Sequence, residues 1–380
     1  MSLPLFVLFA FAACDLGTPI ANDEGEVVIE RVDSDDENFR VVRLVNNLDH
    51  PWAVTWLPDE RKLITERSGT MNLIDGEEIT QLSGLPDIQA SGQGGLLDVA
   101  LHPDYENNGW IYFTYSAPAE NGTGTALARA QLDSAELTDL EELYREEPGH
   151  SSGRHYGSRI VFPEEGKVMF TIGDRGSRNY SQDNDYATGT TIRLNDDGSI
   201  PDDNPYYDSD DVLPEIYTYG HRNAQGMDLH PETGEVWQHE HGPRGGDELN
   251  IIKTGENYGW PDATFGTEYS DDSSIGTYPD EDDDIVNPLL HWSPTSIAPS
   301  GMAFYTGNRF SSWEGDIFVG ALAEEHIRRV VMDGEEVVEE EELLRDDIGR
   351  IRDVRSGPDG YLYFLTDESN GGLYRLEPVE

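Results

Sequence analysis

The sequence predicts an all-β protein with the architecture of a six-bladed β-propeller. Three observations support this fold class. One hairpin pattern recurs six times, helical periodicity is almost absent, and no long linker interrupts residues 39–380. About 340 residues are many for one ordinary core, but closed all-β architectures reach that size as single domains.

The chain begins with a short apolar segment that ends at Cys14, the only cysteine. Thirteen residues cannot span a bilayer, but they suit the apolar core of an export signal. Because small residues precede Cys14, residues 1–14 resemble an export signal with a lipobox; the alternative is a plain signal peptide. We expect an exported protein, at the cell surface or extracellular, that meets the membrane only through a lipid anchor.

Residues 15–38 are polar and acidic, and they contain a run of four acidic residues and one serine at 33–37. This composition is typical of a disordered tether. We therefore predict a tether at 15–38 and the propeller domain at 39–380.

Each copy of the repeat consists of an alternating apolar strand, a turn with Pro, Asp or Gly, and a second strand rich in Val, Ile, Phe and Tyr. The first strands and turns lie at residues 53–59, 98–104, 159–166, 226–234, 301–307 and 353–360. Six antiparallel units in series predict a propeller, because radial closure protects strand edges. A two-sheet sandwich is the alternative, although it needs no such repetition. Residues 134–146 are the one helix candidate, with a loop as the alternative.

The chain carries 76 acidic and 25 basic residues, a net charge of −51, and only three lysines. The charge is spread along a sequence with ordinary aromatic content, which indicates a folded domain with a solvated acidic surface, as in halophilic proteins. No basic stripe could displace counterions from a nucleic acid, so the composition argues against that partner.

Polar groups gather around the fourth hairpin, between residues 217 and 250. Three histidines and two arginines flank two short strands there: His221, His239, His241, Arg222 and Arg244. Turn chemistry explains the hairpin, whereas the flanking side chains indicate a ligand site. The spacing of His239 and His241 leaves a transition-metal site open as an alternative.

Six motifs together carry a family resemblance. They occupy residues 92–97, 155–159, 220–223, 241–243, 257–261 and 350–354. Their order and blade positions resemble those of the soluble PQQ-dependent glucose and sorbosone dehydrogenases, also called aldose sugar dehydrogenases, over about residues 44–376. Each motif alone is weak, but six in register are specific. The resemblance implies a six-bladed propeller, PQQ, calcium, a sugar substrate and an external electron acceptor.

The resemblance also implies roles for single residues. His155 matches the general base that takes the hydroxyl proton as hydride leaves carbon. Arg222 and Asn223 match the pair that contacts the quinone, where a fixed cation stabilises incoming negative charge. Gln93 matches a residue that hydrogen-bonds the substrate. Structural alternatives are a core position for His155, a loop position for Gln93 and an ion pair for Arg222.

Further positions match cofactor and metal contacts. Arg350 and Arg352 alternate along a predicted strand and so face one side, where two guanidinium groups suit the carboxylates of PQQ. The resemblance implies calcium at main-chain carbonyls, which are ligands that calcium accepts. The implied residues are Gly242 and Pro243, with Glu248 and Tyr258 at a further calcium.

Two positions depart from the family pattern. Glucose-oxidising members carry Asp directly before the catalytic His, where this chain has Arg154. They also place a cofactor-binding Lys after the fifth blade's strand, where residues 320–325 contain none and Ala323 stands instead. Sugar preference and cofactor affinity are expected to change accordingly.

The leading interpretation is oxidation of the anomeric hydroxyl of an aldose to the lactone. One alternative is a calcium-dependent propeller lactonase, which needs a metal bound by side-chain oxygens in the central channel and has no use for Arg350 and Arg352. A second is a non-catalytic propeller that binds carbohydrate or protein.

The acidic composition generates a test of the halophilic interpretation. The melting temperature should rise between about 0.1 M and molar salt, because a Debye length of about 10 Å at the lower salt leaves repulsion among surface carboxylates incompletely screened. Thermal unfolding in a KCl series measures this. A melting temperature that stays flat across the series would contradict the interpretation.

Overall fold

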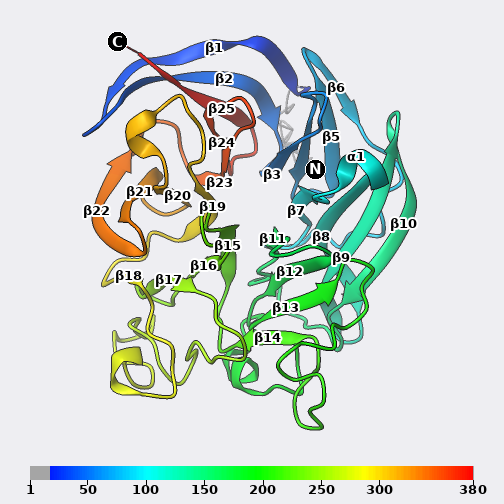
Figure 1. The fold of residues 1–380 in the computed structure, drawn as a ribbon, viewed down its shortest axis with the longest axis vertical. Helices are drawn as coiled ribbons and strands as arrows, with labels where there is room; N and C mark the ends of the chain where they lie inside the picture. The colour runs from blue at the N-terminus through cyan, green and yellow to red at the C-terminus, as the bar shows by residue number, and fades with distance from the viewer. Residues whose placement is uncertain (1–17, 380) are drawn as a thin grey trace, which may run out of the picture.

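The computed structural model describes residues 18–379 and shows six β-sheets arranged as a ring (Figure 1). Five sheets have four antiparallel strands and one has five. The predicted six-bladed β-propeller is confirmed. The predicted export signal, Cys14 and the first residues of the predicted tether lie outside the described residues. Within residues 18–379, no helix is long and apolar enough to cross a membrane.

The blades follow one another along the chain, and each runs from its innermost strand outwards. Blade one contains β3 (Pro51–Trp56), β4 (Lys62–Glu66), β5 (Thr70–Asp75) and β6 (Glu78–Gln81). Blade two contains β7 (Leu96–Leu101), β8 (Trp110–Ala119), β9 (Gly122–Asp133) and β10 (Glu136–Arg145). Blade three contains β11 (Ile160–Val161), β12 (Lys167–Ile172), β13 (Thr190–Asn195) and β14 (Ile216–Tyr219).

The remaining blades complete the ring. Blade four contains β15 (Ala224–Leu229), β16 (Val236–Glu240), β17 (Asp247–Ile251) and β18 (Leu290–Trp292). Blade five contains β19 (Pro299–Phe304), β20 (Ile317–Ala321), β21 (His326–Asp333) and β22 (Glu336–Leu343). Blade six contains β23 (Ile351–Ser356), β24 (Leu362–Thr366), β25 (Gly371–Pro378), β2 (Asn38–Leu48) and β1 (Ile20–Asp33). The described helices are short: α1 (Tyr105–Asn108) and 3-10 turns at Arg178–Gln182, Pro279–Glu281 and Ser311–Trp313.

Blade six joins the two ends of the chain. β2 pairs antiparallel with β25, in a register that places Val41 opposite Leu376 and Val45 opposite Leu373. The ring therefore closes through hydrogen bonds between the first and last parts of the domain. The predicted tether is wrong for Ile20–Asp33, which instead form β1, the outermost strand. The apolar residues Val27, Ile29 and Val32 pair along β2 and outweigh the acidic composition of the segment.

The turn between β1 and β2 is held against blade five by one buried arginine. Arg329, on β21, is 1% exposed and donates to Asp36 at 2.7 Å, to Asp316 at 2.7 Å and to Glu341 at 3.0 Å. Asp36 comes from the acidic run that was predicted to belong to the disordered tether. Three carboxylates around one guanidinium group compensate the burial of its charge.

The helix candidate at 134–146 is a second correction, because this segment forms β10. The strand pairs with β9, and two irregularities in register interrupt the pairing, between Thr138 and Glu141 and between Glu142 and Tyr144. These bulges shift the side-chain alternation and produce spacings of three that resemble a helix. Pairing with the sheet decided the structure.

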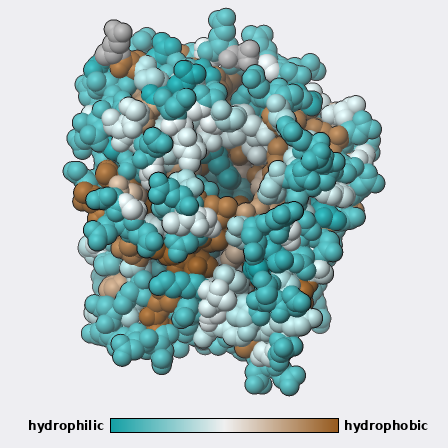
Figure 2. Space-filling model, in the orientation of Figure 1, coloured by the Kyte–Doolittle hydropathy of each residue, from teal (hydrophilic) through white to brown (hydrophobic). Residues whose placement is uncertain are grey.

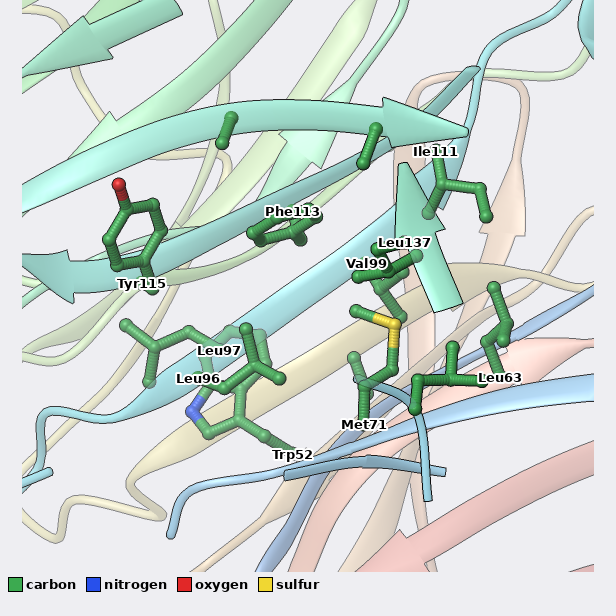
Figure 3. Packing of buried hydrophobic residues seen from close by; sticks show 14 of the residues in the cluster. Trp52, Leu63, Met71, Leu96, Leu97, Val99, Ile111, Phe113, Tyr115 and Leu137 are labelled. Carbon is green, nitrogen blue, oxygen red and sulfur yellow. The ribbon is translucent and has the colours of Figure 1, made fainter. Parts of the chain in front are cut away.

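Apolar side chains fill the spaces between blades. Figure 3 shows Trp52, Met71, Val99 and Phe113 packed between blades one and two. The outer surface is mostly hydrophilic on the face shown in Figure 2, which is hollowed near its centre.

Charged side chains meet where the innermost strands converge. These strands contact one another around the ring, from β3 through β7, β11, β15, β19 and β23 back to β3. Arg159 is completely buried, and one of its nitrogens lies 3.0 Å from Asp98 and 2.9 Å from Asp353. Arg355 contacts the same two carboxylates at 2.7 and 2.9 Å. Asp98, Arg159 and Asp353 hold equivalent positions in three copies of the repeat.

Glycine occupies the same repeat position in blades four and five because there is no room for a side chain. A Cβ atom on Gly301 would lie 2.3 Å from a carboxylate oxygen of Asp353, and one on Gly226 would lie 1.9 Å from the ring of His239. These glycines therefore leave room for the polar side chains of neighbouring strands.

The arginine that holds the β1–β2 turn generates a stability prediction. Arg329→Gln should lower the free energy of unfolding by about 3 kcal/mol, because it leaves Asp316 and Glu341 without their buried counter-ion. Arg345→Gln removes an exposed ion pair in the loop that follows the same blade and should change stability far less. Denaturant unfolding of both variants in molar salt provides the comparison. Equal losses of stability in the two variants would show that Arg329 does not hold the β1–β2 turn against blade five.

Candidate active site

His155 lies in the loop between β10 and β11 and forms a pair with Asp174, which follows β12. Its Nδ1 lies 2.6 Å from Asp174 Oδ1. The indole nitrogen of Trp260 donates to the other carboxylate oxygen of Asp174 at 2.9 Å, and the Gly176 amide donates to Oδ1 at 2.7 Å. A carboxylate at Nδ1 fixes the tautomer with the proton on that nitrogen, so Nε2 is left as a proton acceptor.

The surroundings keep the imidazole neutral. Burial lowers the pKa of His155, and the positive charge of Arg222 acts in the same direction, although the hydrogen bond to Asp174 opposes both. Burial alone would raise the pKa of Asp174, but its interactions with His155 and Arg222 outweigh burial and hold that pKa low. At neutral pH the site therefore holds a neutral imidazole beside an ionised carboxylate, the combination that a general base needs.

Three further predicted residues surround this pair. Gln93 is exposed, and its side-chain oxygen accepts a hydrogen bond of 2.7 Å from the main-chain amide of His155. Asn223 accepts from the amide of Gly157 at 3.1 Å. Arg222 is 8% exposed and donates to the carbonyl of His241 at 3.1 Å. The fold thus brings together residues from blades two, three and four.

Arg350 and Arg352 both reach one carboxylate, that of Asp367 after β24. Arg352 is buried and lies 2.5 Å from Asp367, whereas Arg350 is 43% exposed and lies 3.7 Å away. Arg67 approaches the same carboxylate to 3.5 Å. Three guanidinium groups around one carboxylate leave a surplus of positive charge, which fits the carboxylates of PQQ.

Buried hydrogen-bond partners hold Arg352 in the site. Arg352 donates to Gln225 at 2.9 Å and to Ser300 at 3.1 Å, while its Nε has no partner among the described residues. The positive charges of Arg222 and Arg352 both contribute, after burial, to a lowered pKa at His241. The charges of both arginines therefore act on His241, as expected if the base and the arginine cluster belong to one site.

The segment predicted to bind calcium borders a small cavity beside Arg222. Arg222, Gly242, Glu248, Tyr258 and Trp260 are among its lining residues. A Cβ atom on Gly242 would lie 2.3 Å or less from the carbonyls of Gly245 and Gly246, so two main-chain oxygens converge there.

Main-chain hydrogen bonds hold the same segment. The amide of Gly242 donates to Asp247 at 2.8 Å, and the carbonyl of Pro243 accepts from Tyr269 at 2.7 Å. A carbonyl oxygen has a second lone pair, so Pro243 remains able to bind a cation. The oxygen-rich donor set fits calcium.

The further calcium position has a different donor set. Glu248 is buried opposite Glu240 in the pairing of β17 with β16. Burial and the neighbouring Glu240 raise the pKa of Glu248, as expected of a carboxyl that lacks a cation. The hydroxyl of Tyr258 is already bonded to Ile251 and Lys253, so only its main-chain carbonyl is available as a ligand. The carboxylate of Glu248 and the main-chain carbonyl of Tyr258 are therefore the oxygen atoms that would bind a cation here.

The transition-metal alternative finds no support from geometry. Among residues 18–379, no three His, Cys, Asp or Glu side chains lie together in an arrangement that could hold a metal. His239 is completely buried, and its pKa is lowered to about 3 by burial and by the charge of Arg159.

Sequence reasoning missed the partners that orient the predicted residues. Asp174, Asp367 and Arg67 were not singled out, and Trp260 was quoted only as part of a motif. Asp367 directly follows β24, and Asp174 follows β12 after a single glycine. The carboxylate at a strand end was the available signal, since such positions face the loops that form sites in propellers.

The chain is similar to proteins of known activity. The family profile described as glucose/sorbosone dehydrogenase matches residues 48–375. The chain is 43% identical to an aldose sugar dehydrogenase of Escherichia coli, over 88% of this chain and 92% of that protein. It is 33% identical to quinoprotein glucose dehydrogenase B of Acinetobacter calcoaceticus, over 75% of this chain and 64% of that protein.

Solved structures agree. The apo-form of the soluble aldose sugar dehydrogenase of Escherichia coli superposes with a TM-score of 0.87 at 42% identity, covering 90% of this chain and 100% of that one. The PQQ-bound aldose sugar dehydrogenase of Streptomyces coelicolor, at 24% identity and a TM-score of 0.72 over 94% of this chain and 100% of that one, shares the fold.

The His155–Asp174 pair generates a titration prediction. His155 should titrate below its ordinary pKa of 6.5, because burial disfavours the imidazolium ion. Asp174→Asn should lower the pKa further, because it removes the charge and hydrogen bond that favour the cation. NMR of histidine-labelled protein measures both, with His155→Gln to assign the resonance. A pKa that does not respond to Asp174→Asn would contradict the pairing.

Proposed function

Because the chain belongs to the glucose/sorbosone dehydrogenase family, we propose that it oxidises the anomeric hydroxyl of an aldose sugar to the lactone, with PQQ and calcium as cofactors. The observation that carries the proposal is the buried His155, whose Nδ1 lies 2.6 Å from Asp174 in a site rimmed by arginines. This arrangement supplies a base for the substrate proton and positive charge for the electrons that leave with the hydride.

His155 performs the proton transfer. Its Nε2 accepts the proton of the anomeric hydroxyl, while Asp174 stabilises the imidazolium that forms. Gln93 already uses its side-chain oxygen on the amide of His155. Its NH₂ group can therefore donate to a substrate hydroxyl without releasing the loop.

The arginines bind the cofactor and stabilise the negative charge that develops during the reaction. Arg222, held by His241 and by the ring of Trp260 at 5.4 Å, stands where negative charge develops. Arg350 and Arg352 would hold PQQ carboxylates, and the carbonyls of Gly242 and Pro243 would hold calcium. Bound PQQ would accept the hydride, and calcium would polarise the receiving carbonyl. The missing lysine at Ala323 leaves this binding to the arginines.

The lactonase alternative is less well supported. An enzyme of that class needs free side-chain oxygens at the axis of the ring, but Asp98 and Asp353 are occupied there by Arg159 and Arg355. The non-catalytic alternative leaves the His155–Asp174 pair without a purpose. Reconstitution separates all three, since only the first should gain quinone absorbance and reduce a dye when sugar is added.

We further propose that the enzyme is exported, held at the cell surface through Cys14 or released, and passes electrons to an external acceptor. The apolar segment before Cys14 supports export. The acidic composition supports activity in high salt.

Two substitutions test the separate roles of His155 and Arg350. His155→Ala should bind PQQ and calcium normally but turn over about 10²–10⁴-fold more slowly, because the base is lost. Arg350→Ala should weaken PQQ binding by about 1.5 kcal/mol, since one charge-assisted contact is lost at a half-exposed position. Cofactor titration followed by turnover at saturation, in molar salt with calcium, measures both.

Arg40→Ala is the matched control, because its side chain is 42% exposed but pairs with Glu377, between the outer strands β2 and β25 of blade six. An active His155→Ala enzyme would overturn the mechanism. Normal PQQ binding by Arg350→Ala would overturn the cofactor placement.

A further inference from the structure

The loop that carries His155 adopts a conformation that its own sequence does not favour. His155 has a φ of +55°, in the left-handed region that residues with a side chain rarely occupy. Residues 151–159 form no strand. A backbone of this kind persists only where the surrounding structure holds it.

Arg175 makes many of the contacts that keep the backbone in this conformation. It directly follows Asp174, its side chain is completely buried, and its guanidinium group reaches two main-chain carbonyls just before the base and one aromatic ring just after it. Nη1 donates to the carbonyl of Arg154 at 2.9 Å, and Nη2 donates to the carbonyl of Ser152 at 3.0 Å. The guanidinium carbon also lies 3.3 Å from the centre of the Tyr156 ring. Residues 152, 154 and 156 are thus all contacted by one side chain.

Arg175 also ties the loop to blade two. Nη2 lies 3.1 Å from the hydroxyl of Thr123, on β9, and that hydroxyl lies 2.8 Å from the phenol of Tyr156. The loop therefore cannot shift without breaking bonds to the sheet beside it.

The counter-ion of Arg175 is Glu146, at the end of β10. Glu146 is 1% exposed, and its Oε2 lies 3.7 Å from Nε of Arg175. The carboxylate accepts from the amide of Thr125 at 2.9 Å and from the hydroxyl of Thr188 at 3.2 Å. The titratable or charged groups that face it are Arg175, His150, Glu147 and Tyr144.

We propose that Arg175 is the positioning residue for His155, and that the carboxylate of Glu146 holds Arg175 in place. The inference rests on the proposed role of His155 as the base. Asp174 orients the imidazole ring, whereas Arg175 fixes the backbone from which the ring projects. A displacement of about 1 Å at a reacting group can slow a reaction by about 10²-fold, so the backbone bonds matter as much as the ring contact.

The carboxyl of Glu146 changes charge within the working range of pH. Burial raises its pKa to about 7, and the charge of Arg175 limits the increase. Above that pH, Arg175 has an anionic partner; below it, only carbonyls and hydroxyls hold the guanidinium group. Because the folded pKa is raised, the stability contributed by this group is present at low pH and is lost as the pH rises through about 7.

Turnover and stability therefore respond in opposite senses to Glu146→Gln. About one pH unit below 7, where the wild-type carboxyl is protonated, the variant should turn over like the wild type. About one unit above 7 it should turn over more slowly, yet melt no lower than the wild type. A purely structural role predicts that turnover and melting temperature fall together.

The main experiment compares Arg175→Gln, Arg175→Lys and Arg329→Gln. Arg329 is a matched control, because it is as deeply buried but contacts only the β1–β2 turn and blade five. Hydrogen exchange of residues 150–156 measures the loop directly, and kcat and KM are measured at saturating cofactor. Arg175→Gln should speed exchange and lower kcat by about 10²-fold with little change in KM. Arg175→Lys should restore part of both, and Arg329→Gln should change neither.

The outcomes distinguish this inference from the proposed function. Wild-type exchange and kcat in Arg175→Gln, or equal losses in Arg329→Gln, would overturn the positioning role. If Arg175→Gln does not fold, Arg175→Lys and Glu146→Gln carry the same test, and wild-type behaviour in both would overturn it. An active His155→Ala enzyme would instead overturn the proposed function, while faster loop exchange in Arg175→Gln would still support the positioning role.

Discussion

The structure depends on a buried ion network where the innermost strands meet. Arg159 binds Asp98 and Asp353, so one guanidinium group joins blades two, three and six. Removing one member of a buried network leaves uncompensated charge, at a cost of roughly 3–5 kcal/mol. His155 lies four residues before Arg159, so the bonds that join the innermost strands also anchor one end of the loop that carries the base. The contacts between blades and the placement of the site are therefore linked.

The distribution of arginine follows from the same physics. In a chain with a net charge of −51, most of the surface repels anions. The buried arginines stand where a carboxylate or an anionic ligand compensates them, as Arg329 does at the β1–β2 turn and Arg352 does at Asp367. The surplus positive charge around Asp367 is unusual in this chain, and it marks the place where an anionic cofactor gains most from binding.

Much of the fold could be predicted because its unit is local. Each hairpin has its own alternation and turn residues, so six copies identify six blades without any knowledge of contacts. The prediction failed where pairing with a neighbouring strand overrode local composition. Ile20–Asp33 read as a tether and residues 134–146 as a helix, yet both complete the outer edges of blades. Bulges in β10 concealed its alternation, and the acidic residues of β1 concealed the pairing of its valines and isoleucines.

By itself, the sequence determined the blade count and the acidic character of the surface. It also singled out candidate site residues such as His155 and Arg222, because each belongs to a motif of neighbouring residues. Only the tertiary structure decided which groups these residues meet. Asp174 lies 19 residues from His155, and Glu240 lies 18 residues from Arg222. Burial and pairing between separate strands set the protonation state of the imidazole, because desolvation and nearby charge act through space and not along the chain.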